Sequence, residues 1–404
     1  MASMPGDQKV MVLQNGSPKF VEIGDVKDVQ GLKTVAYDQV TCQAKILPVA
    51  AHIRHPERSE LVKVKTKTGR EIVVTPDHSL FALDAVGRLI DVPAGTLAKG
   101  SRIAIAARLP CGYADIKSLN LVDIIPNARI YAPEEIKAAS HKIGYYQASA
   151  VCGVASITDY YGNFRRASPA SMKKEVFFNL MAAAEMPMEK SKLQVKLLRK
   201  SRHIPAELEM SDEFLRLLGY YISEGTVNFS GKNSSVALYN KNVEVLDDMR
   251  GCMAKFGEAT ELKIGNRIYA ELLTALCGRG KNKRIPELIF GLSKERIGQF
   301  LSGLFTGDGH TTHQSFGYTT TLKELAQQLQ QLLLVYGIVA SVYRNESKNT
   351  YGLAFYREED KEEFLKYVKV PGRKAFLRKA KTINKKKVND VYLDTVKEVE
   401  FISL

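Results

Sequence analysis

The chain has few cysteines, and their spacing gives no indication of a disulfide framework or a zinc site. The five cysteines are odd in number and far apart, and none forms a C-x-x-C pair. The sequence has no run of about 18 apolar residues, and its N-terminus, MASMPGDQKV, lacks the apolar segment of a signal peptide. These absences predict a reduced, cytoplasmic protein with no membrane partner.

Acidic residues are outnumbered by basic ones. The 404 residues include 58 Lys and Arg against 44 Asp and Glu, which gives a formal net charge of +14. Such a surface attracts polyanions, so nucleic acid is the leading candidate partner, and a device for solubility alone is the alternative. The length and the 45% hydrophobic content allow two or three domains with cores of their own.

Residues 1–117 contain short runs that alternate apolar and polar residues, as β-strands do. The segment ELVKVKTKTGREIVVT, residues 60–75, predicts a hairpin with its turn at Thr68-Gly69. Further short strands follow, separated by glycines. Residues 369–404 end in two strand-like runs that resemble this opening region.

Residues 118–205 differ in kind. SMKKEVFFNLMAAAEM (171–186) and EKSKLQVKLLRKSRHIP (189–205) are predicted to be two helices that are broken near Met186-Pro187. The second predicted helix carries Lys192, Lys196, Arg199, Lys200 and Arg202. Such a basic face either contacts DNA as part of an auxiliary module or is a solvated charged surface.

A motif occurs twice within residues 206–368. LLGYYISEGT (217–226) and FLSGLFTGDGH (300–310) are apolar, helix-like runs that end in an acid followed by glycine. The acids, Glu224 and Asp308, lie 84 residues apart (308 − 224), and strand, helix and strand patterns follow both motifs in the same order. Two such halves predict a pseudo-two-fold domain, which suits a two-stranded target.

The glycine inside each run, Gly219 or Gly303, lets the two motif helices approach closely and places the acids side by side. The glycine after each acid is expected to form a left-handed C-cap. Two carboxylates at adjacent helix C-termini repel each other unless a cation lies between them. Glu224 and Asp308 are therefore candidate ligands of Mg²⁺ or Mn²⁺, whereas a single copy of the motif would read as a polar helix end.

These motifs resemble the two LAGLIDADG signatures of a single-chain homing endonuclease, over roughly residues 206–365. The resemblance implies curved four-stranded sheets in the DNA major groove, with Glu224 and Asp308 beneath the minor groove as catalytic metal ligands. It also implies a lysine in a K-x-I-P setting. In GKNKRIPELIF (280–290) this lysine is Lys283, with Lys281 as a substitute. Its implied role is to stabilise developing phosphate charge or to tune the attacking water. The alternative is a lysine that only contacts phosphate.

Base readout is expected on polar side chains of the sheet strands, because these can face the major groove. The candidates are Asn228, Ser234, Tyr239, Gln314, Tyr318 and Thr320. The basic residues of 118–205 would instead neutralise phosphates and make binding depend steeply on salt.

The flanking segments resemble an intein. SMPGDQKV (3–10) is similar to the opening block, in which the nucleophile precedes x-x-Gly-Asp, and Ser3 holds that position. VTPDHSLFAL (74–83) is similar to the T-x-x-H block. The resemblance implies that Thr75 and His78 polarise and protonate the scissile peptide in an N–O acyl shift without a cofactor, although His78 could be an ordinary strand-end histidine.

The resemblance predicts an α+β chain. Residues 1–117 and 369–404 would form a horseshoe-shaped, all-β Hint splicing domain that is interrupted by the region 118–205 and by the endonuclease domain, residues 206–368. One departure concerns the C-terminus. Inteins end in His-Asn, whereas VYLDTVKEVEFISL (391–404) resembles only the strand before that segment, so the final blocks are expected to be truncated or supplied in trans by a C-terminal intein fragment.

We therefore expect a monomeric, intein-encoded, site-specific double-strand DNA endonuclease with an incomplete splicing domain and a host extein protein. Two alternatives stay open. One is a LAGLIDADG-type nucleic-acid-binding protein that does not cleave. The other is a Hint protein-processing module whose endonuclease has decayed.

Overall fold

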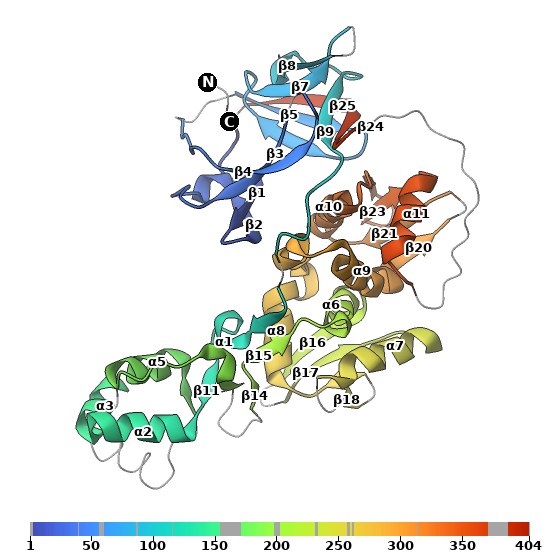
Figure 1. The fold of residues 1–404 in the computed structure, drawn as a ribbon. Coiled ribbons are helices and arrows are strands. Elements are labelled where there is room, and N and C mark those ends of the chain that lie inside the picture. The colour runs from blue at the N-terminus through green and yellow to red at the C-terminus, as the bar shows by residue number, and fades with distance from the viewer. Residues whose placement is uncertain are drawn as a thin grey trace.

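The computed structural model of the chain has three parts along its length: a β-sheet region that holds both termini, a two-repeat region, and a small mixed region (Figure 1). The structure describes residues 3–38, 40–55, 60–85, 88–114, 116–153, 171–197, 203–230, 233–256, 259–260, 262–312, 314–370 and 387–403. Within these residues, no helix combines the length and the apolar character that a membrane span requires.

The β-sheet region contains two sheets. The first has the order β2-β1-β3-β4. Its strands are β1 (Lys9–Gln14), β2 (Ser17–Glu22), β3 (Lys33–Tyr37) and β4 (Ala44–Pro48), with the 3-10 helix η1 (Ile23–Asp25) after β2. The second has the order β6-β5-β25-β9-β7-β8, with β24 paired to β25. Its elements are β5 (Glu60–Thr66), β6 (Glu71–Val74), β7 (Ser79–Leu83), β8 (Leu89–Pro93), η2 (Ala94–Thr96), β9 (Arg102–Ala106), β24 (Lys387–Val388) and β25 (Val391–Ser403).

The predicted hairpin of residues 60–75 is confirmed by the pairing of β5 with β6. Val62 and Val64 are at most 1% exposed and pack with Val74 in a small core. The turn contains Gly69 at φ +81°, a left-handed conformation that costs glycine little. Alternating β-branched and polar residues form a strand here because only one face has a core to pack against.

The last long strand, β25, lies in the middle of the second sheet. It pairs antiparallel with β5, where Phe401 lies opposite Val62, and with β9, where Asp394 lies opposite Ile103. Just after β9, the amide of Ala107 donates to the carbonyl of Asp390 at 2.8 Å. The chain therefore leaves and re-enters this sheet at neighbouring points, and the residues between β9 and β24 form an insertion between adjacent strands.

The small mixed region follows β9. It contains a four-stranded sheet of order β12-β11-β13-β14 and a two-stranded pair, β10-β15. Its elements are β10 (Ser118–Asn120), α1 (Leu121–Ile124), β11 (Arg129–Tyr131), α2 (Pro133–Ile143), α3 (Tyr145–Val151), β12 (Ser171–Lys173), α5 (Lys174–Ala183), η3 (Lys190–Lys192), β13 (Gln194–Lys196), β14 (Ile204–Pro205) and β15 (Glu207–Glu209).

The first helix predicted in this region is confirmed by α5, and the second, over residues 189–205, is wrong. Its described residues form η3, β13 and β14 instead. Leu193 and Val195 are at most 3% exposed, and β13 pairs with β11, so hydrogen bonds to a strand more than 60 residues away, with Val195 opposite Ile130, override the local helix pattern.

The two-repeat region has helix and strand elements in the same order twice. Repeat one comprises α6 (Asp212–Glu224), β16 (Gly225–Ser230), β17 (Asn233–Leu238), α7 (Val243–Ala254), β18 (Ala259–Thr260), β19 (Lys263–Ile264) and α8 (Arg267–Cys277), followed by η4 (Gly280–Asn282) and η5 (Glu287–Gly291). Repeat two comprises α9 (Lys294–Asp308), β20 (Gly309–Thr311), β21 (Phe316–Thr320), α10 (Lys323–Leu332), η6 (Leu333–Tyr336), β22 (Ser341–Asn345), β23 (Thr350–Phe355) and α11 (Glu358–Tyr367).

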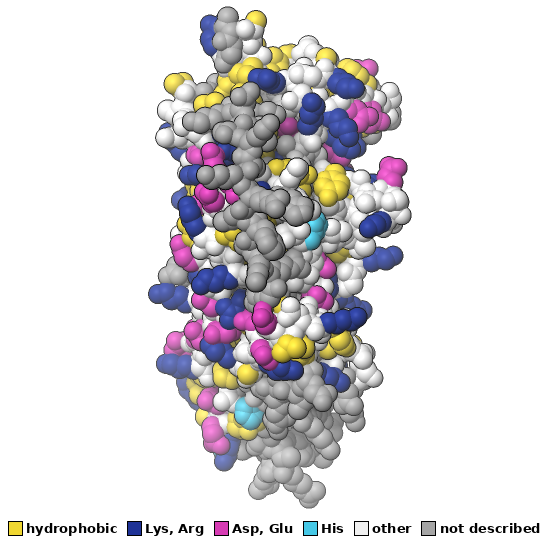
Figure 2. Space-filling model, turned by 90° about the vertical axis from the view of Figure 1, so that its right-hand side faces the viewer, with side chains coloured by type: hydrophobic (Ala, Val, Ile, Leu, Met, Phe, Trp, Pro, Cys, Tyr) yellow, Lys and Arg dark blue, Asp and Glu magenta, His cyan; other side chains and the backbone are white. Residues whose placement is uncertain are grey.

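The sheets of the repeats have the orders β16-β17-β19-β18 and β20-β21-β23-β22, and α6 packs against α9 between them (Figure 1). Both motif helices begin at a serine cap, because Ser211 accepts from Phe214 N and Ser293 accepts from Arg296 N. The pseudo-two-fold arrangement predicted from the repeated motif is therefore present. On the face shown in Figure 2, basic and acidic side chains are interspersed along the molecule rather than gathered by sign.

Candidate active sites

The motif helices meet at the two predicted glycines. A Cβ atom on Gly219 would lie 2.2 Å from the Phe300 carbonyl oxygen, and one on Gly303 would lie 2.2 Å from the Arg216 carbonyl oxygen. No larger residue fits at either position without moving the facing backbone. The close approach of α6 and α9 brings their C-terminal ends together.

Each motif helix passes directly into the first strand of its own sheet. Gly225 has φ −95° and ψ 152°, and Gly309 has φ −71° and ψ 154°, which are extended conformations. The expected left-handed C-caps are therefore wrong. Both positions need glycine for another reason. A Cβ on Gly225 would lie 2.6 Å from the Cα atom of Tyr221, and a Cβ on Gly309 would lie 2.4 Å from the carbonyl oxygen of Phe305.

The structure brings the two acids of the motifs to one place. A Cβ on Gly307, a residue that the sequence reasoning missed, would lie 2.8 Å from the Cγ atom of Glu224, so the chain just before Asp308 packs against the Glu224 side chain. Asn240 Nδ2 donates to Glu224 Oε1 at 3.0 Å, and the Tyr318 hydroxyl donates to Asp308 Oδ2 at 3.3 Å. A neutral donor from each repeat thus orients that repeat's acid.

The acids act together electrostatically. Burial raises the pKa of Glu224, while the hydrogen bond from Asn240 and the charge of Lys283 act in the opposite direction. Burial also raises the pKa of Tyr318, and the charges of Asp308 and Glu224 raise it further. Since both Tyr318 and Lys283 interact with both carboxylates, the two acids share one negative site.

Lys283 closes the end of α6. Its ammonium donates to the carbonyls of Tyr221, Ile222 and Gly225 at 2.8, 2.9 and 2.8 Å. Burial lowers the pKa of Lys283, and the nearby acids act against this. The ammonium therefore satisfies carbonyls at the helix C-terminus and places a positive charge beside the acids. Lys281, the proposed substitute, is exposed on η4.

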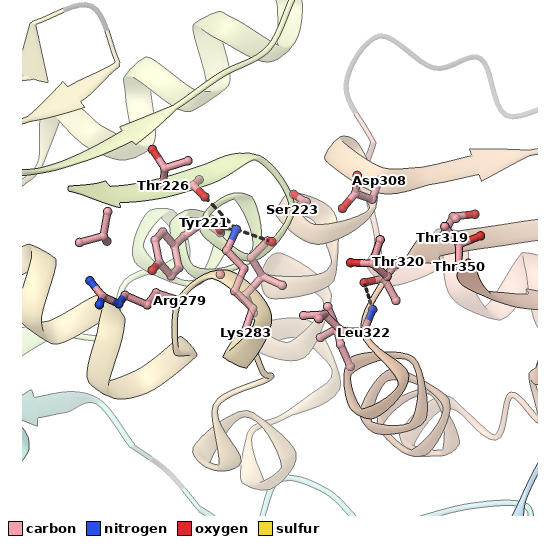
Figure 3. A pocket seen from close by; sticks show the side chains of 16 residues that line it. Tyr221, Ser223, Thr226, Arg279, Lys283, Asp308, Thr319, Thr320, Leu322 and Thr350 are labelled. Atoms are coloured by element: carbon pink, nitrogen blue, oxygen red, sulfur yellow. Dashed lines mark hydrogen bonds between the residues drawn. The ribbon is translucent and has the colours of Figure 1, made fainter. Parts of the chain in front are cut away.

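A cavity of about 690 Å³ opens between the repeats, and Asp308 is the one of the two acids that lines it (Figure 3). Lys283 and Arg279 line it from repeat one, and Asp308 and the run Thr319–Thr321 line it from repeat two. Arg279, which the sequence reasoning missed, also lies over the Phe229 ring at 5.4 Å. Cations and hydroxyls facing each other across a cavity suit the charged oxygens of a phosphodiester.

The donor set fits a hard divalent cation. Two carboxylates at adjoining helix ends supply oxygen ligands, which Mg²⁺ and Mn²⁺ prefer. The described residues contain no cluster of three or more His, Cys, Asp and Glu side chains that could hold a metal. Glu224 and Asp308 would therefore need further oxygen ligands from substrate, water or backbone.

Two of the proposed base-reading residues lie on the wrong side of their strands. Ser234 is 3% exposed and lies on the same side of β17 as the core residue Val236, and Tyr318 is fully buried with its ring against Phe305. Because side chains alternate along a strand, a shift of one residue exchanges the inner and outer faces. Asn228, Tyr239 and Gln314 are exposed and Thr320 is partly exposed, so these four stay predictions.

The predicted DNA-contacting residues of the mixed region differ in their exposure to solvent. Lys192 is exposed and pairs with Glu189 at 2.7 Å. Lys196 is only 6% exposed and lies over the Tyr131 ring at 5.2 Å, so its expected contact with phosphate is wrong. It points inward because it belongs to β13 rather than to a solvated helix. Arg199, Lys200 and Arg202 lie outside the described residues.

The three splicing candidates meet at the end of β6. Ser3 N donates to Thr75 Oγ1 at 3.0 Å, and Thr75 N donates to the Ser3 carbonyl at 2.9 Å. His78 N donates to the Thr75 carbonyl at 3.0 Å. The His78 Nδ1 atom is buried and has no hydrogen-bond partner among the described residues, and burial lowers the pKa of this imidazole. The peptide nitrogen of Ser3 is thus held by Thr75, with a neutral imidazole on the same turn.

Comparison with known proteins agrees with this architecture. Residues 211–282 and 295–369 match the LAGLIDADG-like domain family. A DNA polymerase of Thermococcus sp. (strain GE8) is 28% identical over 84% of this chain and 24% of the polymerase, and that of Thermococcus hydrothermalis is 26% identical over 96% of this chain and 28% of the polymerase. The chain thus spans about a quarter of the length of these relatives.

Two solved structures are similar to parts of this chain at low sequence identity. The homing endonuclease I-DmoI in complex with DNA and Mn is 13% identical over 40% of this chain and 97% of that one, with a TM-score of 0.32. An intein from a hyperthermophile is 16% identical over 26% of this chain and 73% of that one, with a TM-score of 0.23.

The family match and the sheet interrupted between β9 and β25 confirm the predicted α+β fold class. The chain thus contains a two-repeat region that matches the LAGLIDADG-like domain family and that is inserted between adjacent strands of a β-sheet region.

Proposed function

We propose that the two-repeat domain is a site-specific endonuclease that cleaves double-stranded DNA, with Glu224 and Asp308 as the ligands of Mg²⁺ or Mn²⁺. The observation that carries this proposal is the pair of carboxylates at the ends of two helices in glycine-to-backbone contact. The match to the LAGLIDADG-like domain over both repeats supports it. The domain boundaries that we propose are those predicted above.

The residues around the acids have separate tasks in this reaction. Asn240 and Tyr318 orient the carboxylates, and Lys283 offsets the negative end of α6 so that phosphate can approach. When bound, the cation supplies Lewis-acid stabilisation of charge on the phosphodiester oxygens. The exposed Asn228, Tyr239 and Gln314 and the partly exposed Thr320 would read base edges, and Lys192 would contact phosphate.

The test uses Glu224→Gln and Asp308→Asn in the full chain. Each change removes a negative ligand and keeps the shape, so cleavage of plasmid carrying the insertion site should fall at least about 100-fold. Duplex affinity measured by fluorescence anisotropy in Ca²⁺ should change less than about fivefold, because phosphate contacts remain. Undiminished cleavage by either variant would contradict the assignment, and loss of binding would point to a structural role for the acid.

We also propose acyl-shift chemistry at Ser3, on the evidence of its hydrogen bonds with Thr75. The Ser3 hydroxyl oxygen attacks the preceding carbonyl carbon, a C–O bond forms and the C–N bond breaks. The hydroxyl proton passes to the released amine through His78, whose lowered pKa keeps its imidazole neutral at neutral pH. The proposed partner is the host extein joined at Ser3.

Release of an upstream extein by hydroxylamine measures this reaction. His78→Ala should slow release at least about tenfold, in the range of a lost general acid or base, and Thr75→Val should slow it because the contact with the Ser3 amide is lost. His55→Ala is the matched control, since His55 belongs to another part of the β-sheet region. Equal release by the His78→Ala variant would contradict the proposed role of His78 as the proton carrier in the acyl shift at Ser3.

A further inference from the structure

The turn between β5 and β6 is held by the second endonuclease repeat. Val342 N donates to the Thr68 carbonyl at 2.9 Å, and Gln330 Nε2 donates to the same carbonyl at 2.7 Å and to the Ala340 carbonyl at 2.9 Å. Gly69 lies so close that a Cβ would be 2.1 Å from the Val342 carbonyl oxygen. The hairpin tip therefore fits a polar socket formed by α10 and β22.

The same turn holds a buried charge of the C-terminal strand. Asp394 of β25 is 2% exposed and accepts from the hydroxyl of Thr68 at 2.5 Å and from its amide at 3.3 Å. Arg70 Nη1 donates to the Thr68 hydroxyl at 2.8 Å, and the charge of Asp394 opposes the effect of burial on the pKa of Arg70, which is lowered to about 10. A charge buried in this way is costly unless its partners stay in place.

A second contact ties the returning chain to the same repeat. Lys387 of β24 donates to the Gly337 carbonyl and to Asp360 Oδ1, the latter at 3.2 Å, and Asp360 is 5% exposed. At the rim, Lys323 of α10 pairs with Glu71 of β6 at 3.0 Å. β24, which follows the insertion, and β6 of the hairpin thus both make polar contacts with repeat two.

β25 lies between the two strand pairs that flank the proposed splicing site in the chain. On one side it pairs with β5, whose hairpin partner β6 leads to Thr75, and on the other with β9, which pairs with β7 after His78. Loosening β25 would therefore loosen the strands β5, β6, β7 and β9 that surround the turn carrying Thr75 and His78.

We propose that repeat two completes the splicing sheet: through Gln330 and β22 it positions the Thr66–Arg70 turn, and through Thr68 it fixes Asp394, so β25 is firmly docked only when the endonuclease domain is folded. Gln330 is thereby a positioning residue for a site in the other domain. The coupling between the two parts can be tested whether or not Ser3 reacts.

The experiment is amide hydrogen exchange, followed by mass spectrometry, on the full chain. Gln330→Ala removes both donations from the socket, so exchange of residues 66–70 and of β25 should accelerate about tenfold, the effect of one buried hydrogen bond. Gln327→Ala, one turn earlier on the same helix, is the matched control and should leave β25 unchanged. Faster exchange confined to α10 and β22 would overturn the proposal.

A second variant distinguishes the proposed coupling from simple unfolding of repeat two. Thr68→Val removes the hydroxyl between Asp394 and Arg70 but keeps the carbonyl that Gln330 holds, so β25 should again exchange about tenfold faster while α10 stays protected. When Thr68→Val is combined with Gln330→Ala, the exchange of β25 should be little faster than in either single variant, because both changes break the same chain of contacts from Gln330 through Thr68 to Asp394. Fully additive effects on β25 would show that the socket and Asp394 act independently and would also overturn the proposal.

Discussion

Glu224 in repeat one and Asp308 in repeat two end equivalent helices, yet their surroundings differ. Glu224 is half-buried, is held by an amide and lies beside the ammonium of Lys283, which caps its helix. Asp308 is exposed and is held by the hydroxyl of a fully buried tyrosine. The duplication thus preserves the backbone at the centre of the domain, while the side chains around each acid have diverged.

The largest expected effect concerns what the repeats share. Gly219→Ala and Gly303→Ala each force a Cβ against facing backbone, so each should destabilise the fold by about 3 kcal/mol or more, lower Tm by roughly 6–12 °C and reduce DNA cleavage strongly. Calorimetry and a plasmid nicking assay measure both. If the backbone is symmetric, the two losses should be similar.

Gly251→Ala is the control for these glycines. Gly251 lies in α7, and a Cβ there meets no atom within 4 Å. Alanine should stabilise the helix by up to about 1 kcal/mol because it is the better helix former. A tolerated alanine at Gly219 or Gly303 would show that α6 and α9 do not touch as described.

The second-largest expected effect, that of replacing Lys283, concerns the end of α6 in repeat one. Lys283→Met leaves three carbonyls at the end of α6 without their donor, at a cost of about 1–3 kcal/mol, and removes the positive charge beside the acids. Cleavage should fall at least about tenfold. Lys281→Met, two residues earlier and exposed, should retain cleavage within about twofold. Equal losses in both variants would contradict the assignment of Lys283 over Lys281.

The smallest effect distinguishes the two acids by pH. Burial raises the pKa of Glu224 in the folded chain. The contribution of this group to the free energy of unfolding is therefore fully present below its ordinary pKa and is lost as the pH rises through the raised pKa. Glu224→Gln should therefore raise Tm at pH 7 by at most a few degrees and leave it unchanged near pH 4.

Asp308→Asn supplies the comparison, since Asp308 is exposed. Its Tm should change less at pH 7 than that of the Glu224 variant. Thermal melts in chelator at both pH values measure the difference, so that added metal does not mask it. Equal stabilisation by both variants would show that the two acids have the same environment despite their different burial.

The sequence was sufficient where a local pattern has one physical solution. A glycine within an apolar helical run, followed by an acid and a second glycine, predicted α6, α9 and the meeting of Glu224 with Asp308, because only glycine permits such an approach. Ser3, Thr75 and His78 also come together as the short motifs indicated. These features depend on residue type at a fixed spacing, which the chain carries in itself.

Other features depended on distant partners. The strand at Gln194–Lys196 exists because β11 pairs with it, and that pairing buries Lys196, which a helix would have exposed. The core determines which face of β17 and β21 is inside, so Ser234 and Tyr318 are buried. The socket around Thr68 draws on β5, α10 and β25 together. Only the tertiary structure decides such contacts, because the free energy of pairing a buried polar group depends on groups that are hundreds of residues away in the sequence.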